Sequence, residues 1–154
     1  MEKLHHEIFI AAPVEKVWNT MLEKETYMKW TKPFSPGTKT ESWFEGSWDK
    51  GSDLKFIGVD DDGNKGGMAS RVAENRKHEF ISIEHIGIVD AEGNVDTTSE
   101  FATQWTPAFE NYTFVAKDGG TQVQVDVDTV AEYKEMFDTA WPKALALLKE
   151  MAEK

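Results

Sequence analysis

One segment constrains the fold more than any other, because residues 130–154 carry the longest amphipathic helix pattern in the chain. Apolar side chains recur there every three or four positions for about five turns, which is typical of a helix with one buried face. They are Tyr133, Met136, Phe137, Ala140, Trp141, Ala144, Leu145, Leu147, Leu148, Met151 and Ala152. Such a face is stable only against a second apolar surface, so the rest of the chain must supply one.

The remaining sequence is mostly strand-like. Residues 4–11 alternate apolar and polar side chains, Pro13 then opens a helix that begins at Val14, and a second short helix is predicted over residues 25–30. Six further strands are predicted over residues 41–48, 53–59, 66–74, 80–88, 109–116 and 122–129. In the last of these strands, valines share one face and polar residues share the other, so one face of the sheet is expected to contact water.

These elements predict an α+β fold with one domain that spans residues 1–154, since a chain of 154 residues fits a single domain. Consecutive antiparallel strands twist, and the terminal helix is long enough to cover their apolar face. We therefore expect a helix-grip fold: a curved antiparallel sheet of six to seven strands around the long C-terminal helix, with two short helices after the first strand. The segment Ile88 to Pro107 is longer and more polar than a plain hairpin, and its part from Asn94 to Pro107 is assigned no element.

Several motifs resemble those of START-like (SRPBCC) domains. The run Ile8-Phe-Ile-Ala-Ala-Pro-Val-Glu-Lys-Val-Trp18 is similar to the place where the first strand of these domains meets the first helix. Residues 43–56, 66–74 and 80–85 are similar to the strands that follow. Within the superfamily, the chain looks most like the branch related to the C-terminal domain of the activator of heat-shock-protein-ninety ATPase. The resemblance covers Leu4 to about Met151 and implies a single START-like domain.

Composition and charge exclude several classes of function. The 17 basic and 28 acidic residues give a formal net charge of −11, and such a surface repels the phosphate backbone of nucleic acids. The chain has no cysteine, and its four histidines show no metal-binding spacing. No apolar run reaches the roughly 20 residues of a membrane span, and the first residues do not resemble a signal peptide. We expect a cytoplasmic protein with no nucleic-acid partner, no membrane span, no metal and no cofactor.

The aromatic residues, 6 Trp, 9 Phe and 3 Tyr, suggest where a ligand would bind. A curved sheet and one helix cannot interlock so many rigid rings without gaps, so a hydrophobic cavity is predicted between them. Phe137 and Trp141 lie four residues apart and should face the sheet together, whereas His85 shares its strand face with Ile81 and Ile83. The predicted ligand-binding residues are Phe56, Met68, His85, Phe137, Trp141 and Leu145, and the predicted ligand is a small apolar or amphipathic molecule.

Two alternatives to ligand binding stay open. The first is a protein-interaction module similar to a cochaperone domain, whose acidic surface would meet a basic, chaperone-type partner. The second is an enzyme of the cyclase, lyase or hydrolase type, as some related START-like folds are, with Glu84, Arg71 and His85 as the polar residues to examine. No sequence motif for a nucleophile, phosphate loop or dinucleotide site occurs, so no catalytic residue is predicted.

Overall fold

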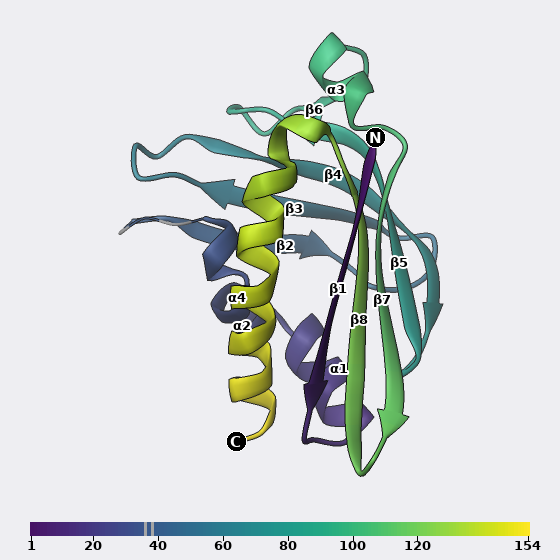
Figure 1. Ribbon diagram of the computed structural model, residues 1–154. Helices are drawn as coiled ribbons and strands as arrows, with labels where there is room; N and C mark the ends of the chain where they lie inside the picture. The colour runs from purple at the N-terminus through teal and green to yellow at the C-terminus, as the bar shows by residue number, and fades with distance from the viewer. Residues whose placement is uncertain (36, 38) are drawn as a thin grey trace.

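The computed structural model, which describes residues 1–35, 37 and 39–154, is an α+β domain in which a curved antiparallel sheet wraps around one long helix (Figure 1). The main path of the sheet runs β1-β8-β7-β5-β4-β3-β2, and the short β6 pairs with β5. The strands are β1 (Glu2–Ile10), β2 (Glu41–Gly46), β3 (Asp53–Val59), β4 (Lys65–Arg76), β5 (Phe80–Val89), β6 (Val95–Asp96), β7 (Ala108–Lys117) and β8 (Gly120–Thr129). The helices are α1 (Val14–Leu22), α2 (Lys24–Trp30), η1 (Lys32–Phe34), α3 (Glu100–Gln104), η2 (Ala131–Tyr133) and α4 (Lys134–Ala152). The predicted helix-grip fold is confirmed.

The observed elements depart from the sequence pattern in a few places. The C-terminal helix begins with the 3-10 turn η2, and α4 itself starts at Lys134. The strand predicted over residues 41–48 ends at Gly46, where φ is 120° and a Cβ atom would lie 2.2 Å from the carbonyl oxygen of Asp53. Only glycine adopts this conformation without strain, so the strand stops there. The segment 94–107, to which the sequence pattern assigned no element, contains β6 and α3.

Two indole rings close the C-terminal end of α1. The last carbonyl groups of a helix have no partner within the helix, so they need donors from elsewhere. The Nε1 of Trp30 donates to the carbonyl oxygen of Met21 at 3.1 Å, and the Nε1 of Trp48 donates to that of Leu22 at 2.9 Å. These bonds tie α1 to α2 and to the turn that follows β2.

The helix α4 lies against the inner face of the curved sheet (Figure 1). Its buried residues share one face and are Ala140, Trp141, Ala144, Leu145, Leu148 and Ala152. The small alanines let α4 lie close to β1, where the Nζ of Lys149 donates to the carbonyl oxygen of Phe9 at 3.0 Å. No helix in the described ranges is long and apolar enough to cross a membrane.

Charged side chains cover the outer face where β1 pairs with β8, while the three valines of β8 are buried on the inner face. The Nζ of Lys3 donates to Oδ1 of Asp128 at 2.8 Å. The Nδ1 of His5 lies 2.6 Å from Oδ1 of Asp126, and its Nε2 lies 2.8 Å from Oε2 of Glu7. The predicted sheet with one wet face is therefore present at this edge.

His5 is expected to stabilise the fold more at acidic than at alkaline pH. The hydrogen bond to Asp126, followed by that to Glu7, raises the pKa of His5 above its usual value of 6.5. The folded state then holds the proton more tightly than the unfolded state does. The resulting stabilisation is complete below pH 6.5 and is lost as the pH rises through the raised pKa.

Urea denaturation of the wild type and of His5→Gln tests this expectation. The difference in unfolding free energy should be larger at about pH 5.5 than at about pH 9, and it should stay below about 1 kcal/mol because solvent screens exposed pairs. An equal difference at both pH values would contradict it. In Asp126→Asn, which removes the first partner, the pKa of His5 measured by NMR should fall.

Candidate functional site

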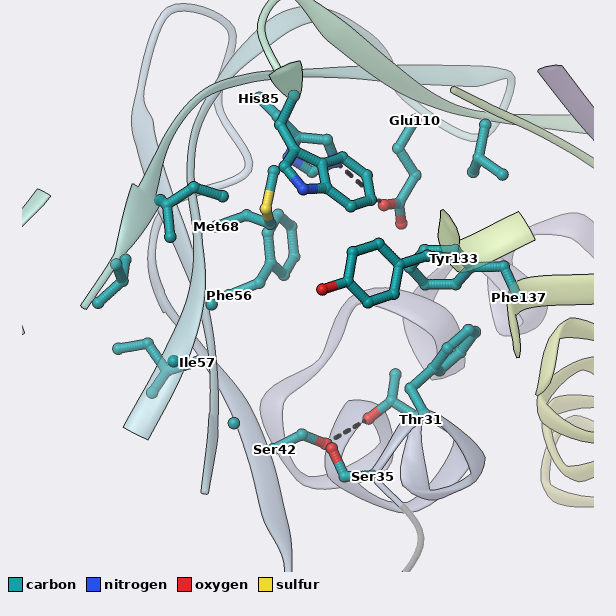
Figure 2. A pocket seen from close by; sticks show the side chains of 18 of the residues that line it. Thr31, Ser35, Ser42, Phe56, Ile57, Met68, His85, Glu110, Tyr133 and Phe137 are labelled. Atoms are coloured by element: carbon teal, nitrogen blue, oxygen red, sulfur yellow. Dashed lines mark hydrogen bonds and ion pairs between the residues drawn. The ribbon is translucent and has the colours of Figure 1, made fainter. Parts of the chain in front are cut away.

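A cavity of about 500 Å³ lies between the inner face of the sheet and the helical elements α2, η1, η2 and α4. This volume is within the range of small-molecule sites, about 300 to 1,000 Å³. In Figure 2, Phe56 and Met68 lie on the sheet side of the cavity, and Tyr133 and Phe137 lie on the helix side. Phe56 and Met68 are direct partners across β3 and β4, which places their side chains next to each other on one face.

Eleven of the 26 described residues that line the cavity carry aromatic rings. Those from the helical segments are Tyr27, Trp30, Phe34, Tyr133, Phe137 and Trp141. Those from the strands and from the α3 region are Trp43, Phe56, Phe101, Trp105 and Tyr112. The rings contact one another directly: Phe34 meets Trp141 edge to face, at 74° with ring centres 4.8 Å apart, and Trp30 meets Trp141 at 36° and 6.1 Å.

Five of the six predicted ligand-binding residues line this cavity: Phe56, Met68, His85, Phe137 and Trp141. The sixth, Leu145, lies one turn beyond Trp141 on α4, is 2% exposed and belongs to the hydrophobic core instead of the cavity wall. The apolar face of α4 therefore continues from Trp141 to Leu145. Core side chains fill the space beside Leu145, whereas Trp141 borders the open cavity.

One end of the cavity carries a chain of hydrogen-bonded polar groups. The buried ring of His85 places Nδ1 2.7 Å from Oγ of Ser70 and Nε2 3.3 Å from Oε1 of Glu110. Because an ionised carboxylate only accepts hydrogen bonds, the Nε2–H of His85 is the donor to Glu110. The hydroxyl of Tyr112 donates to Oε2 of the same carboxylate. Burial, and then the negative charge of Glu110, raises the pKa of Tyr112 well above its usual value.

The opposite end of the cavity carries hydroxyl groups. In Figure 2, Thr31, Ser35 and Ser42 lie across the cavity from His85 and Glu110. The hydroxyl of Thr31 donates to the carbonyl oxygen of Tyr27 at 2.6 Å, and its oxygen lies 2.9 Å from Oγ of Ser42. Since a hydroxyl has one proton, Ser42 is the donor to Thr31. The cavity is thus apolar along its walls and polar at both ends.

The segment around α3 contributes apolar residues where the cavity meets the surface. Phe101 and Met136 both line the cavity and are 44% and 45% exposed. Trp105, at the end of α3, packs on Tyr133 with ring centres 5.5 Å apart. Its Nε1 is buried and has no hydrogen-bond partner in the part of the chain that the structure describes. The segment for which the sequence predicted no element therefore borders the cavity.

Glu110 and Tyr112 were not predicted as site residues, although the sequence holds a signal for them. In β7, Ala108, Glu110, Tyr112 and Phe114 alternate onto one face, and the other three are buried. A carboxylate among apolar residues of one strand face indicates a polar group that points inward. No such alternation in the sequence places Trp30 and Trp105 in the cavity wall, because the positions of their rings depend on how segments distant in the sequence pack together.

The residues considered for catalysis do not come together in the cavity. Arg71 and Glu84 pair across β4 and β5, and neither lines the cavity, whereas His85 does. Alternation along the strand points Glu84 to the other side of the sheet from His85. No group of histidine, aspartate and glutamate within residues 1–35, 37 and 39–154 could hold a metal ion.

Known proteins share this architecture. The model of the family described as "Activator of Hsp90 ATPase homolog 1-like protein" matches residues 11–153. A protein from Nitrosomonas europaea is 15% identical, with a TM-score of 0.72 over 97% of this chain and 93% of that chain. An AHSA1-like protein from Aeromonas hydrophila is 15% identical, with a TM-score of 0.71 over 99% and 92%. The Aha1 dimer from Colwellia psychrerythraea is 16% identical, with a TM-score of 0.68 over 99% and 97%.

No curated protein sequence matches the chain. At identities of 15 to 16%, the likeness to these solved structures shows a common fold. The family model, in contrast, matches the sequence itself from residue 11 to residue 153. Because that match spans nearly the whole chain, the protein belongs to the family of Activator of Hsp90 ATPase homolog 1-like proteins.

Proposed function

We propose that this protein binds a small amphipathic molecule in the cavity between the sheet and α4. The observation that carries the proposal is a space of about 500 Å³ with aromatic walls and polar groups at its two ends. The walls, among them Phe56, Phe137 and Trp141, would cover the apolar body of the ligand, and each Å² of apolar surface buried contributes about 25 cal/mol before the costs of association.

The polar ends would orient the ligand. At one end, the Glu110 carboxylate accepts hydrogen bonds from His85 and Tyr112, and a carboxylate has further lone pairs for a ligand donor. At the other end, the protons of Thr31 and Ser42 are already donated within the protein, so the Ser42 oxygen can accept a hydrogen bond from a polar group of the ligand. A ligand that is apolar in the middle and polar at one or both ends matches this arrangement.

The neutral probe N-phenyl-1-naphthylamine, whose fluorescence rises in apolar surroundings, tests the proposal. We expect saturable binding of one probe per chain. Gly58→Trp places a new ring in the cavity, because Gly58 of β3 belongs to the cavity wall. The strand can accept the Cβ atom, whose nearest neighbour would be Oγ of Ser35 at 3.6 Å. The affinity for the probe should fall at least about tenfold, or about 1.4 kcal/mol.

Lys55→Trp is the matched control, because Lys55 lies on the same strand and its side chain points to the other face of the sheet. Its affinity for the probe should stay within about twofold of the wild type. A wild-type chain that does not bind the probe would overturn the proposal and favour the protein-interaction alternative. If the wild type does bind the probe, native mass spectrometry of protein taken directly from cells would identify the ligand, as a mass retained by the wild type and lost from Gly58→Trp.

A further inference from the structure

Acidic groups predominate among the ionisable side chains around the cavity. The lining includes the acidic residues Glu110 and Asp128 and the imidazole of His85, and no lysine or arginine occurs among the described residues that line it. The carboxylate of Asp128 belongs to the outer face of the sheet, where the Nζ of Lys3 lies 2.8 Å from its Oδ1 and supplies a counter-charge. Glu110 is paired with His85 alone in the described part of the chain. Glu110 is therefore the carboxylate in the wall whose charge is available to a ligand.

The Glu110 carboxylate has room for another partner. It accepts from His85 through Oε1 and from Tyr112 through Oε2, which uses two of the roughly four positions at which a carboxylate accepts hydrogen bonds. Its side chain is 22% exposed. In Figure 2 the carboxylate points from β7 into the cavity, toward Tyr133. A donor group on a bound molecule can thus reach it.

The surroundings of Glu110 favour a positive charge. Aromatic faces attract cations, and the rings of Tyr27, Tyr112 and Trp141 belong to the same wall. Burial, and then the negative charge of Glu110, raises the pKa of Tyr27, another residue of this wall. A carboxylate on a ligand would be repelled by Glu110, and no lysine or arginine lies in the described part of this wall to pair with it.

We propose that the cavity selects amphipathic molecules whose polar end is a protonated amine, and that Glu110 determines this selectivity. The inference rests on the function proposed above and adds the chemical class of the ligand. The ammonium group would donate to Glu110 beside the aromatic rings, while the hydrocarbon part would lie between the sheet and α4.

Competition against bound N-phenyl-1-naphthylamine tests the selectivity with three molecules that share one chain: decylamine, decan-1-ol and decanoate. At neutral pH, decylamine should displace the probe at a concentration at least about tenfold lower than decanoate, with decan-1-ol between them. Glu110→Gln keeps the shape of the side chain and removes its charge. In this variant, the concentrations of decylamine and decanoate that displace the probe should differ by less than about threefold.

Glu92→Gln is the control for the general attraction of cations to an acidic protein. It removes one negative charge from the exposed turn between β5 and β6, so its preference for decylamine should remain that of the wild type. Equal displacement by the three molecules in the wild type would overturn the charge selectivity and leave the proposed function intact. A preference lost equally in both variants would also overturn the role of Glu110. If the wild type does not bind the probe, the proposed function fails and this inference fails with it.

Discussion

Replacing Trp30 with alanine is expected to lower the free energy of unfolding by about 4 kcal/mol, since removal of a buried tryptophan typically costs about 3 to 5 kcal/mol. Trp30 is 1% exposed and packs against Tyr27 and Trp141, with ring centres 5.4 and 6.1 Å away. Its loss would leave a hole next to the existing cavity. It would also leave the carbonyl oxygen of Met21 without the indole donor at the end of α1.

Urea denaturation followed by circular dichroism measures this loss. Trp30→Phe is the control, because it keeps an aromatic ring in place and removes the hydrogen bond to Met21 together with part of the ring. Trp30→Phe should lower the free energy of unfolding by about 1 to 2 kcal/mol, clearly less than Trp30→Ala. If Trp30→Ala lost less than about 1 kcal/mol, the ring would not be a packing element of this core.

Gly67→Ala is expected to destabilise the protein by about 3 kcal/mol, the upper part of the usual range for overpacking. A Cβ atom at Gly67 would lie 1.8 Å from the carbonyl oxygen of Phe56 and 2.9 Å from its carbonyl carbon. Both are backbone atoms of the neighbouring strand, so β3 and β4 would have to separate. Because Phe56 and Met68 are partners across these strands, the wall of the cavity would move as well.

Gly66→Ala is the matched control for this prediction. It changes the neighbouring residue of the same strand, where a Cβ atom would find its nearest neighbour, the carbonyl oxygen of Val89, at 4.0 Å. Its unfolding free energy should stay within about 0.5 kcal/mol of the wild type. Thermal denaturation and binding of N-phenyl-1-naphthylamine would be measured on both variants. Equal stability of the two would contradict the close approach of β3 and β4.

Much of the fold could be predicted from local patterns. The alternation of residues 122–129 indicates a strand with one buried face, and β8 has that face buried. The helical period of residues 130–154 indicates α4, and it places Phe137 and Trp141 together on the side that lines the cavity. These predictions succeed because the backbone geometry of a strand or a helix determines which side chains share a face.

The polar end of the cavity could not be predicted in the same way. His85 and Glu110 come from β5 and β7, and they are not direct partners, since His85 pairs with Ala108 and Glu110 with Ile83. Their contact depends on the register of the two strands and on the direction of both side chains. Trp105 likewise reaches the cavity through α3, where the sequence predicted no element.

Leu145 shows the same limit on α4. Its position in the helical period is as favourable as that of Trp141, yet it lies in the filled core. Whether space remains under a helix depends on the volumes of side chains contributed by many elements and on how far the sheet curls away from it. Neither quantity is a property of one segment.

The sequence by itself determined the seven long strands, the helices α1, α2 and α4, the buried faces of β8 and α4, the negative charge, and the aromatic content from which a cavity was predicted. The tertiary structure decided that the cavity is open at Trp141 and closed at Leu145, and that Glu110 lies in its wall beside His85. The physical reason is that periodicity follows from local backbone geometry. The volume and charge of a cavity follow from side chains that meet only after the sheet has curled around α4.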